Sequence, residues 1–167
     1  MSGPVEREAR PAAGEVALSD GLARTIVERF AAHNDRLRRA VAGLTPQALD
    51  RALGPDTNSM AVLVAHVAGS ELGWLHLAAG RPFERDRDAE FRTAGKTAAD
   101  LERMIDRADE AMPDLVRGAI AGGLGTARRT RDGKDVTAGY ALVHALEHLA
   151  EHVGQLELTR QLVRGEA

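Results

Sequence analysis

The sequence predicts an all-α protein that folds as a four-helix bundle, and three observations support this prediction. Four long segments carry apolar residues at helical spacing. Residues typical of helix termini lie at the ends of these segments, and no segment has the apolar–polar alternation of a β-strand. The 167 residues are enough for one domain with a sizeable core, and 44% hydrophobic with 28% charged residues is typical of a globular protein.

The N-terminal residues differ in composition from the rest of the chain. Residues 1–18 mix Pro, Gly, Ala and charged residues without apolar periodicity, so we expect a flexible N-terminal arm there and a single domain over residues 19–167. Ser19 fits the N-cap of a first helix, which is expected to end near Ala42 because Gly43 follows it.

Two more helices are expected before the middle of the chain. A short helix should run from Pro46 to about Leu53, because proline favours the first helical position. Asn58 or Ser59 then caps the second long helix, over residues 60–79, and glycine and proline follow its end.

A charged segment without periodicity, residues 81–96, links the second and third long helices. This link of about 17 residues is long enough to cross the bundle, so the two helices are expected to run parallel. Thr97 and Asp100 resemble a capping box that begins the third helix. This helix is expected to reach about Ala119, and Pro113 within it predicts a kink or a break.

The last helix follows a loop with a turn at Asp132 and Gly133. Thr137 caps this helix, which covers residues 138–164, and Gly165 ends it.

Composition excludes several classes of function. The net charge of −3, without a basic block, argues against nucleic-acid binding. No run approaches the roughly 18 apolar residues of a membrane span, and no apolar signal segment begins the chain, so we expect a cytoplasmic protein without membrane contact. The chain has no cysteine. Any metal ligands must therefore be His, Asp or Glu, and any thiol chemistry needs a thiol that arrives as a substrate.

The candidate site begins with three histidines in the last helix. His144, His148 and His152 are spaced four residues apart, and residues four apart are neighbours on one helix face. The outer two are separated by about 12 Å along the axis and about 80° around it, so one ion can bind only an adjacent pair. A third ligand must come from another helix, and His66 is the best candidate because it lies on the apolar face of the second long helix.

Other readings of these histidines stay open at this point. A single HxxxH pair often has no metal, and residues alone do not decide between the pair His144–His148 and the pair His148–His152. The residues that follow His144 and His148 are Ala145 and Leu149, so the HExxH motif of a zincin is absent. No glutamate has a histidine three residues later, which excludes the di-iron bundle motif.

Two segments resemble the DinB/YfiT superfamily of four-helix proteins, which is related to thiol-dependent S-transferases. They are LVAHVAGSELGWL at residues 63–75 and EHLAEHVGQLELTRQL at residues 147–162. The family pattern has a histidine, a glutamate and an aromatic residue on the second helix, and HxxxHxxQ with a later arginine on the last. The matching residues are His66, Glu71, Trp74, His148, His152, Gln155 and Arg160. His144 is an addition to this pattern.

The resemblance implies an up-down-down-up bundle over about residues 20–164. It also implies a divalent metal ion, nickel or zinc above all, held by His66, His148 and His152. Many members are homodimers, so a homodimer is expected, and the family's DNA-damage name does not imply DNA binding.

The function expected from this resemblance is metal-dependent transfer of a small-molecule thiol of the bacillithiol, mycothiol or glutathione type. Glu71 and Gln155 are the catalytic candidates, as a proton relay and a ligand contact, and Trp74 and Arg160 are candidates for binding the cosubstrate. Each has a structural alternative, namely a surface charge for Glu71, an interhelical hydrogen bond for Gln155, core packing for Trp74 and an ion pair for Arg160.

Two other functions stay open beside it. One is a metal-dependent hydrolase that uses metal-bound water. The other is a non-catalytic, stress-related dimeric bundle.

Overall fold

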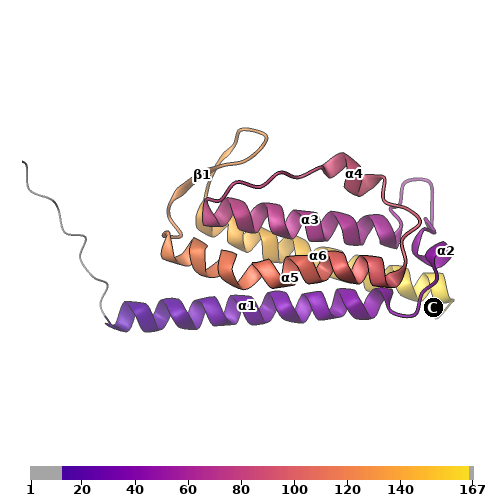
Figure 1. Cartoon of the computed structure of the whole chain (residues 1–167), viewed down its shortest axis with the longest axis horizontal. Coiled ribbons are helices and arrows are strands. Elements are labelled where there is room, and N and C mark those ends of the chain that lie inside the picture. Colours follow the sequence, from indigo (N-terminus) through magenta and orange to yellow (C-terminus); the bar gives the residue numbers. More distant parts are fainter. Residues whose placement is uncertain (1–12, 166–167) are drawn as a thin grey trace, which may run out of the picture.

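Four long helices lie side by side along one axis (Figure 1). The structure is a computed structural model, and it describes residues 13–165, with side chains from residue 17 onward. The long helices of this part are α1 (Ala13–Val41), α3 (Met60–Ala79), α5 (Ala98–Ala121) and α6 (Ala138–Arg164). The connections contain the short helices α2 (Pro46–Leu49) and α4 (Arg87–Phe91) and the strands β1 (Ala127–Arg129) and β2 (Asp135–Thr137).

The helices follow an up-down-down-up order, which confirms the predicted fold. In Figure 1, α1 and α6 run in one direction, whereas α3 and α5 run in the other. The segment between α3 and α5 crosses the whole bundle over the outer face of α3, as its length predicts, and carries α4 on the way. Helix α3 packs against both α5 and α6, and α1 packs against the same two helices from the opposite side.

The predicted helix termini are largely confirmed by the capping contacts. The hydroxyls of Thr45, Ser59 and Thr137 each accept a hydrogen bond from a backbone N–H three residues later. Thr97 and Asp100 form a reciprocal capping box at the start of α5. Gly165 ends α6 in the left-handed conformation, with φ of 72°.

The first helix begins earlier than predicted. It starts at Ala13, so Ser19 lies inside α1 and is not its N-cap. The sequence between these positions, AGEVAL, contains no proline, and its one glycine weakens a helix by only about 1 kcal/mol. Of the expected flexible arm, residues 13–18 are helical, and residues 1–12 lie outside the described residues.

Three further predictions differ from the structure. Of the kink or break expected at Pro113, the break does not occur: α5 continues through the proline, because core residues on both sides of it hold the helix against the bundle. Helix α2 ends at Leu49 instead of near Leu53. The two expected loops contain α4 and an antiparallel hairpin, with Arg128 opposite Val136, both of which are too short for a periodic sequence pattern.

Helix α3 is the core helix of the bundle. Fourteen of its 20 residues are buried, because α5, α6 and α4 cover it. Contrary to the sequence analysis, α3 is long and apolar enough to cross a membrane by length and composition. Since 67% of the apolar window is buried inside the bundle, its composition fits a core helix equally well.

Two arginines cap helix C-termini from distant parts of the sequence. Arg128 of the hairpin donates from Nε to the carbonyl oxygen of Leu77, at 3.0 Å, near the end of α3. Arg160 of α6 donates from Nη1 to the carbonyl oxygens of Ala40 and Ala42, at 2.6 and 3.0 Å, at the end of α1. Positive charge next to unpaired C-terminal carbonyls stabilises a helix end.

A buried polar group of α3 faces α1 and α5. The carboxyl of Glu71 is 2% exposed, and its Oε1 accepts a hydrogen bond from Asn34 Nδ2 at 3.2 Å. Asn34 also contacts Asp109, which accepts a hydrogen bond from Arg38 at 2.7 Å. Burial raises the pKa of Glu71 to about 8, mainly because the ionised carboxylate loses its water, so this carboxyl keeps its proton at neutral pH.

This raised pKa predicts a pH-dependent effect of the variant Glu71→Gln on stability. Between pH 4.5 and about 8 the unfolded chain releases the Glu71 proton and the folded chain keeps it, so the stability contributed by Glu71 declines as the pH rises through this window. Glutamine lacks this proton equilibrium. We expect the melting temperature of the variant, relative to the wild type, to rise by about 5 °C or more from about pH 5 to about pH 8.

The measurement is thermal unfolding followed by circular dichroism across this pH range. Glu110→Gln, at an exposed position of α5, is the matched control and should give a difference independent of pH. A pH-independent difference for Glu71→Gln as well would contradict the raised pKa.

Candidate metal centre

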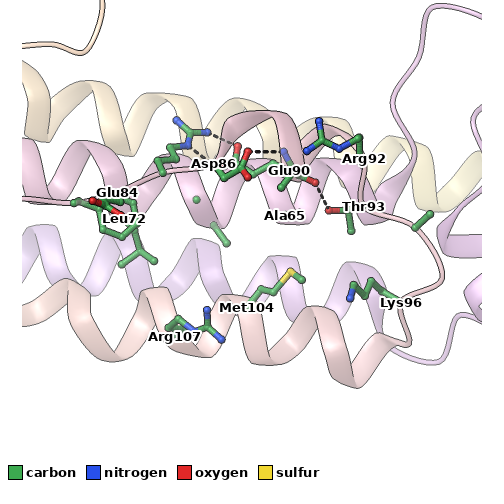
Figure 2. A pocket seen from close by; sticks show the side chains of 16 residues that line it. Ala65, Leu72, Glu84, Asp86, Glu90, Arg92, Thr93, Lys96, Met104 and Arg107 are labelled. Carbon is green, nitrogen blue, oxygen red and sulfur yellow. Dashed lines mark hydrogen bonds and ion pairs between the residues drawn. The ribbon is translucent and has the colours of Figure 1, made fainter.

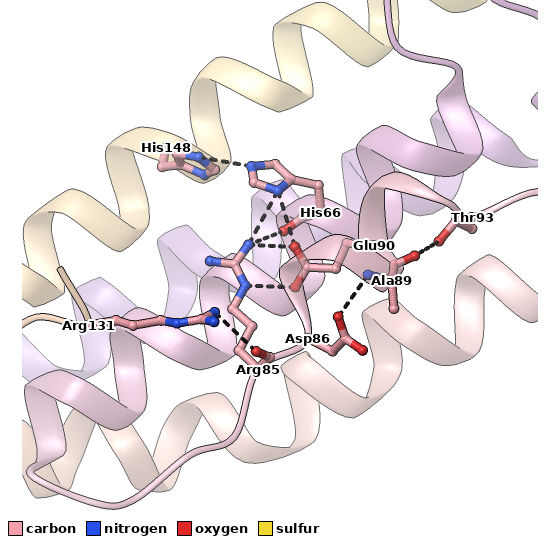
Figure 3. Close-up of polar contacts among 8 residues, drawn as sticks. All are labelled: His66, Arg85, Asp86, Ala89, Glu90, Thr93, Arg131 and His148. Carbon is pink, nitrogen blue, oxygen red and sulfur yellow. Dashed lines mark hydrogen bonds and ion pairs between the residues drawn. The ribbon is translucent and has the colours of Figure 1, made fainter.

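Three histidines from two helices converge at the edge of the interface between α3 and α6. His66 comes from α3, and His148 and His152 come from successive turns of α6. One ring nitrogen of each lies within 4.8 Å of the other two. The Nε2 atoms of His66 and His148 are 3.4 Å apart (Figure 3). This group of three could hold one metal ion.

The packing of α6 sets the orientation of the pair on that helix. Leu149 and Val153 are fully buried and anchor α6 in the core. His148 and His152 each precede one of these residues, so their half-buried rings lie at the edge of the core and point towards α3. Ring centroids of His66 are 5.2 Å from those of both His148 and His152.

Burial and nearby positive charge favour the neutral form of two of these imidazoles, those of His66 and His148. The pKa of His148 is lowered to about 4, first by loss of water and then by the nearby His152 and His66. The pKa of His66 is lowered mainly by burial, with a further contribution from Arg85. Neutral imidazoles offer a lone pair at neutral pH, and three nitrogen donors at this spacing fit a divalent transition metal ion such as zinc or nickel.

The carboxylate of Glu90, on the segment that crosses the bundle between α3 and α5, contacts the ring nitrogen of His66 that is not the one nearest His148. Glu90 Oε2 lies 3.2 Å from His66 Nδ1, and both groups are nearly buried (Figure 3). Arg85 donates to both carboxylate oxygens of Glu90 at 2.7 Å and to the backbone oxygen of His66 at 3.2 Å. Arg85 Nη2 also lies 3.3 Å from His66 Nδ1, so Nδ1 could either accept from Arg85 or donate to Glu90. We place the proton on Nδ1, because Arg85 Nη2 already donates to Glu90 and to the backbone oxygen of His66, whereas an Nδ1–H has the carboxylate as its acceptor. This proton position leaves the lone pair on Nε2, the atom that faces His148.

Two glycines of α3 make room for this contact. A Cβ atom at Gly69 would lie 2.1 Å from Glu90 Oε1, and one at Gly73 would lie 3.4 Å from Arg85 Cδ. The sequence analysis missed Glu90 and Arg85 because their segment has no periodic pattern. Gly69 and Gly73 were a signal that could have indicated this contact. Each glycine inside a helix lowers helix stability by about 1 kcal/mol relative to alanine, so two of them four residues apart indicate that another segment packs closely against that face.

Glu90 also borders a pocket of about 470 Å³ between α3, α4 and α5 (Figure 2). Small residues of α3, Ala65, Ala68 and Gly69, form part of its lining, and Met104 of α5 lies opposite. None of the three histidines lines this pocket. The carboxylate of Glu90 therefore separates the histidines from this space.

Gln155 is in contact with the histidine group. Its Oε1 lies 2.7 Å from Nδ1 of His152 and accepts a hydrogen bond from it. This contact leaves the lone pair of His152 on Nε2, as Glu90 does for His66. Of the predicted catalytic residues, Gln155 is therefore next to the site.

Glu71 and Arg160 lie away from the histidines. Glu71 is five residues after His66 on α3, which rotates it by about 140°, and its carboxyl contacts Asn34 of α1. Arg160 is eight residues after His152, about 12 Å along α6, and caps the end of α1. The structure brings neither side chain to the metal-binding group.

His144 belongs to an aromatic cluster and not to the group of three. Its ring centroid is 4.3 Å from that of Trp74 and 5.7 Å from that of Tyr140, whose ring is nearly parallel to it. The centroid of His148 is 5.9 Å away. Trp74 thus lies beside the site, with His144 between it and the nearer ligand candidate, and the pair on α6 that faces His66 is His148 with His152.

Comparisons with known proteins concern the fold and the family of this chain. No curated protein matches the sequence significantly. Seven chains of known structure do match, among them a DinB-like protein from Bacillus cereus with a TM-score of 0.66. At 13% identity, over 82% of this chain and 89% of that one, this likeness concerns the fold alone. The family model of mycothiol-S-transferase matches residues 25–165, which include all three histidines. Because this match spans most of the chain, the protein belongs to the mycothiol-S-transferase family.

Proposed function

We propose that this protein is a divalent-metal-dependent S-transferase that uses a low-molecular-weight thiol as its cosubstrate. The observation that carries the proposal is the group of three imidazoles, two of them with lowered pKa values, in a chain of this family. The absence of cysteine supports it further, because the sulfur nucleophile must then come from a substrate.

The chemistry of such a reaction follows from the donor set. A divalent ion held by His66, His148 and His152, zinc or nickel by preference, would supply the positive charge beside which a thiol loses its proton. The proton passes to solvent. The thiolate sulfur of the substrate then forms a bond to the electrophilic carbon, and the bond to the leaving group breaks with its electron pair.

The chain's own residues act mainly by orientation. Glu90 holds the Nδ1 proton of His66, and Gln155 holds that of His152, so both rings present Nε2 to the same space. In this proposal Glu90 and Gln155 are positioning residues. Glu71 has no step, because it is buried, protonated at neutral pH and directed towards α1.

The metal site predicts different effects for neighbouring histidine substitutions. Replacing His152 by alanine removes one of three ligands, so we expect zinc or nickel affinity to fall by about 100-fold or more. His144→Ala is the matched control, because it removes an imidazole of the same helix that lies one turn before His148 and outside the group of three, and affinity should change by less than about threefold. Metal content after purification and competition with a chelator measure both values. A larger loss in His144→Ala than in His152→Ala would refute this choice of ligands.

The close contact at Gly69 gives a second test of the site. In Gly69→Ala the new methyl group would displace Glu90, so metal affinity should fall by about tenfold, with helix content unchanged. Gly21→Ala is the control, because a Cβ there meets nothing within 4 Å. It should leave metal affinity unchanged and stabilise α1 by about 1 kcal/mol. Wild-type metal affinity in Gly69→Ala would show that Glu90 does not position His66.

The transferase activity itself is tested with metal-loaded protein. We expect mycothiol, bacillithiol or glutathione to be consumed with a model electrophile such as monochlorobimane, with formation of the thioether detected by mass spectrometry. His152→Ala should lose this activity. Ester hydrolysis without thiol consumption would favour the hydrolase instead, and metal binding without either reaction would favour a non-catalytic bundle. The expected homodimer is tested separately, by light scattering.

A further inference from the structure

Helix α4 lies over α3 without contributing a residue to the core. None of its five residues is buried. Ala89 and Glu90 of this helix line the pocket of about 470 Å³ between α3, α4 and α5, so α4 covers a cavity instead of packed apolar side chains (Figure 2). A helix of this length without apolar burial has little stability of its own, and it opens at a low free energy.

His66 provides the side-chain contacts that hold α4 on the bundle. Among the described residues, its side chain is the only one outside the crossing segment, residues 81–96, that forms a hydrogen bond, an ion pair or a ring contact with α4. Glu90 Oε2 lies 3.2 Å from His66 Nδ1 (Figure 3), and the centre of the Phe91 ring lies 4.9 Å from that of the imidazole. The guanidinium of Arg87, one turn earlier, lies 4.6 Å from the centre of the Phe91 ring. Glu90 and Phe91 therefore hold the same imidazole.

The crossing segment is anchored on both sides of α4. Before α4, the ring of Phe83 stacks on that of His76 of α3, at 4.7 Å between centres. After α4, the backbone N–H of Gly95 donates to Asp50 Oδ2 at 2.7 Å. Neither anchor involves the three candidate ligands, so α4 can separate from His66 while the ends of the segment stay in place.

The imidazole of His66 joins α4 to the candidate metal centre through its two nitrogens. Nδ1 faces Glu90, and Nε2 lies 3.4 Å from Nε2 of His148. A cation on Nε2 draws electron density from the ring, which makes the Nδ1–H a stronger hydrogen-bond donor to the carboxylate. It also fixes the ring against which Phe91 packs. Because linkage is reciprocal, the factor by which docked α4 raises metal affinity equals the factor by which the ion favours docking.

From these contacts we propose that α4 is a metal-dependent clamp, which docks on His66 when a divalent ion binds the three histidines and opens more often without it. Glu90 and Phe91 are the two residues of the clamp, and Phe91 is thus a further positioning residue of His66. Opening of the clamp exposes the pocket beneath α4. The inference rests on the metal site of the proposed function and not on thiol transfer.

Hydrogen exchange followed by mass spectrometry tests the clamp in the whole protein, metal-free and saturated with zinc. The backbone N–H of Glu90 donates to the oxygen of Asp86, at 3.3 Å, so its exchange reports the opening of α4. With zinc we expect the peptide that covers α4 to exchange about tenfold more slowly, which is the lower end of the effect of a residue that orients a metal ligand. The hairpin β1–β2 is the internal reference and should change by less than about twofold.

Variants assign this response to the two residues of the clamp. In Glu90→Gln, saturated with zinc, the slowing should fall below about threefold, because the carboxylate that accepts from Nδ1–H is lost. Asp88→Asn, at an exposed position of the same helix, is the matched control and should keep the response of the wild type. Phe91→Ala should weaken the response, and Phe91→Leu, which retains an apolar side chain, should restore most of it.

A metal-free measurement tests the contact with His66 by itself. His66→Ala should speed the exchange of α4 without zinc, because both contacts of the clamp are lost, whereas His144→Ala should not. Zinc binding to the wild type without slower exchange of α4, or with equal slowing of α4 and the hairpin, would overturn the proposal.

The outcome is separable from that of the proposed function, because exchange is measured without thiol or electrophile. If α4 responds to zinc and metal-loaded protein consumes no thiol, the clamp stands and the transferase function fails. If thiol is consumed and α4 does not respond, the transferase function stands and the clamp fails. Protein that takes up no divalent ion would overturn the metal site on which both depend.

Discussion

The packing of α3 against α6 determines the distance between His66 and the pair on α6. Both helices present residues to the core on one side of the contact and histidines at its edge. Val67 of α3 and Leu149 of α6 are fully buried directly beside the histidines that they follow. The spacing of the imidazole nitrogens is therefore set by apolar packing, which is close to crystalline density and resists small displacements. The crossing segment then adds the contact that fixes the ring of His66.

Burial has opposite chemical consequences at two positions of α3. At His66 it lowers the pKa and keeps the imidazole neutral, which leaves a lone pair for a cation. At Glu71 it raises the pKa to about 8 and keeps the carboxyl neutral, which removes the charge that a base needs. Loss of water penalises the charged form in both cases, and the neutral form is the useful one only for the histidine. This difference explains why His66 belongs to the site and Glu71 belongs to the core.

The sequence was sufficient for the parts of the fold that depend on long periodic patterns or on local hydrogen bonds. The apolar spacing predicted the long helices, and the side chains of Ser59, Thr97 and Thr137 predicted three of their starts. The limits of α1 and the continuity of α5 depend on packing between distant segments, which overrides a single serine or proline.

The same distinction applies to the site. The four-residue spacing and the inward position of His66 predicted that His66 meets an adjacent pair on α6, and the family resemblance implied that this pair is His148 with His152. Glu90 could not be identified, because its contact with His66 joins α3 to a segment without pattern. The contacts of Arg160 and Glu71 likewise depend on α1, which no local motif connects to them.

The length of the segment between α3 and α5 also affects where Glu90 lies along α3. Helix α3 is about 30 Å long, and the 17 residues from Arg81 to Thr97 would reach about 56 Å if fully extended. The five residues of α4 shorten this contour by about 9 Å, since a helical residue advances 1.5 Å instead of about 3.3 Å. Helix α4 therefore shortens the path of the segment, and its residue Glu90 lies beside His66. An insertion or deletion between the end of α3 and α4 would therefore move this carboxylate along the bundle relative to His66.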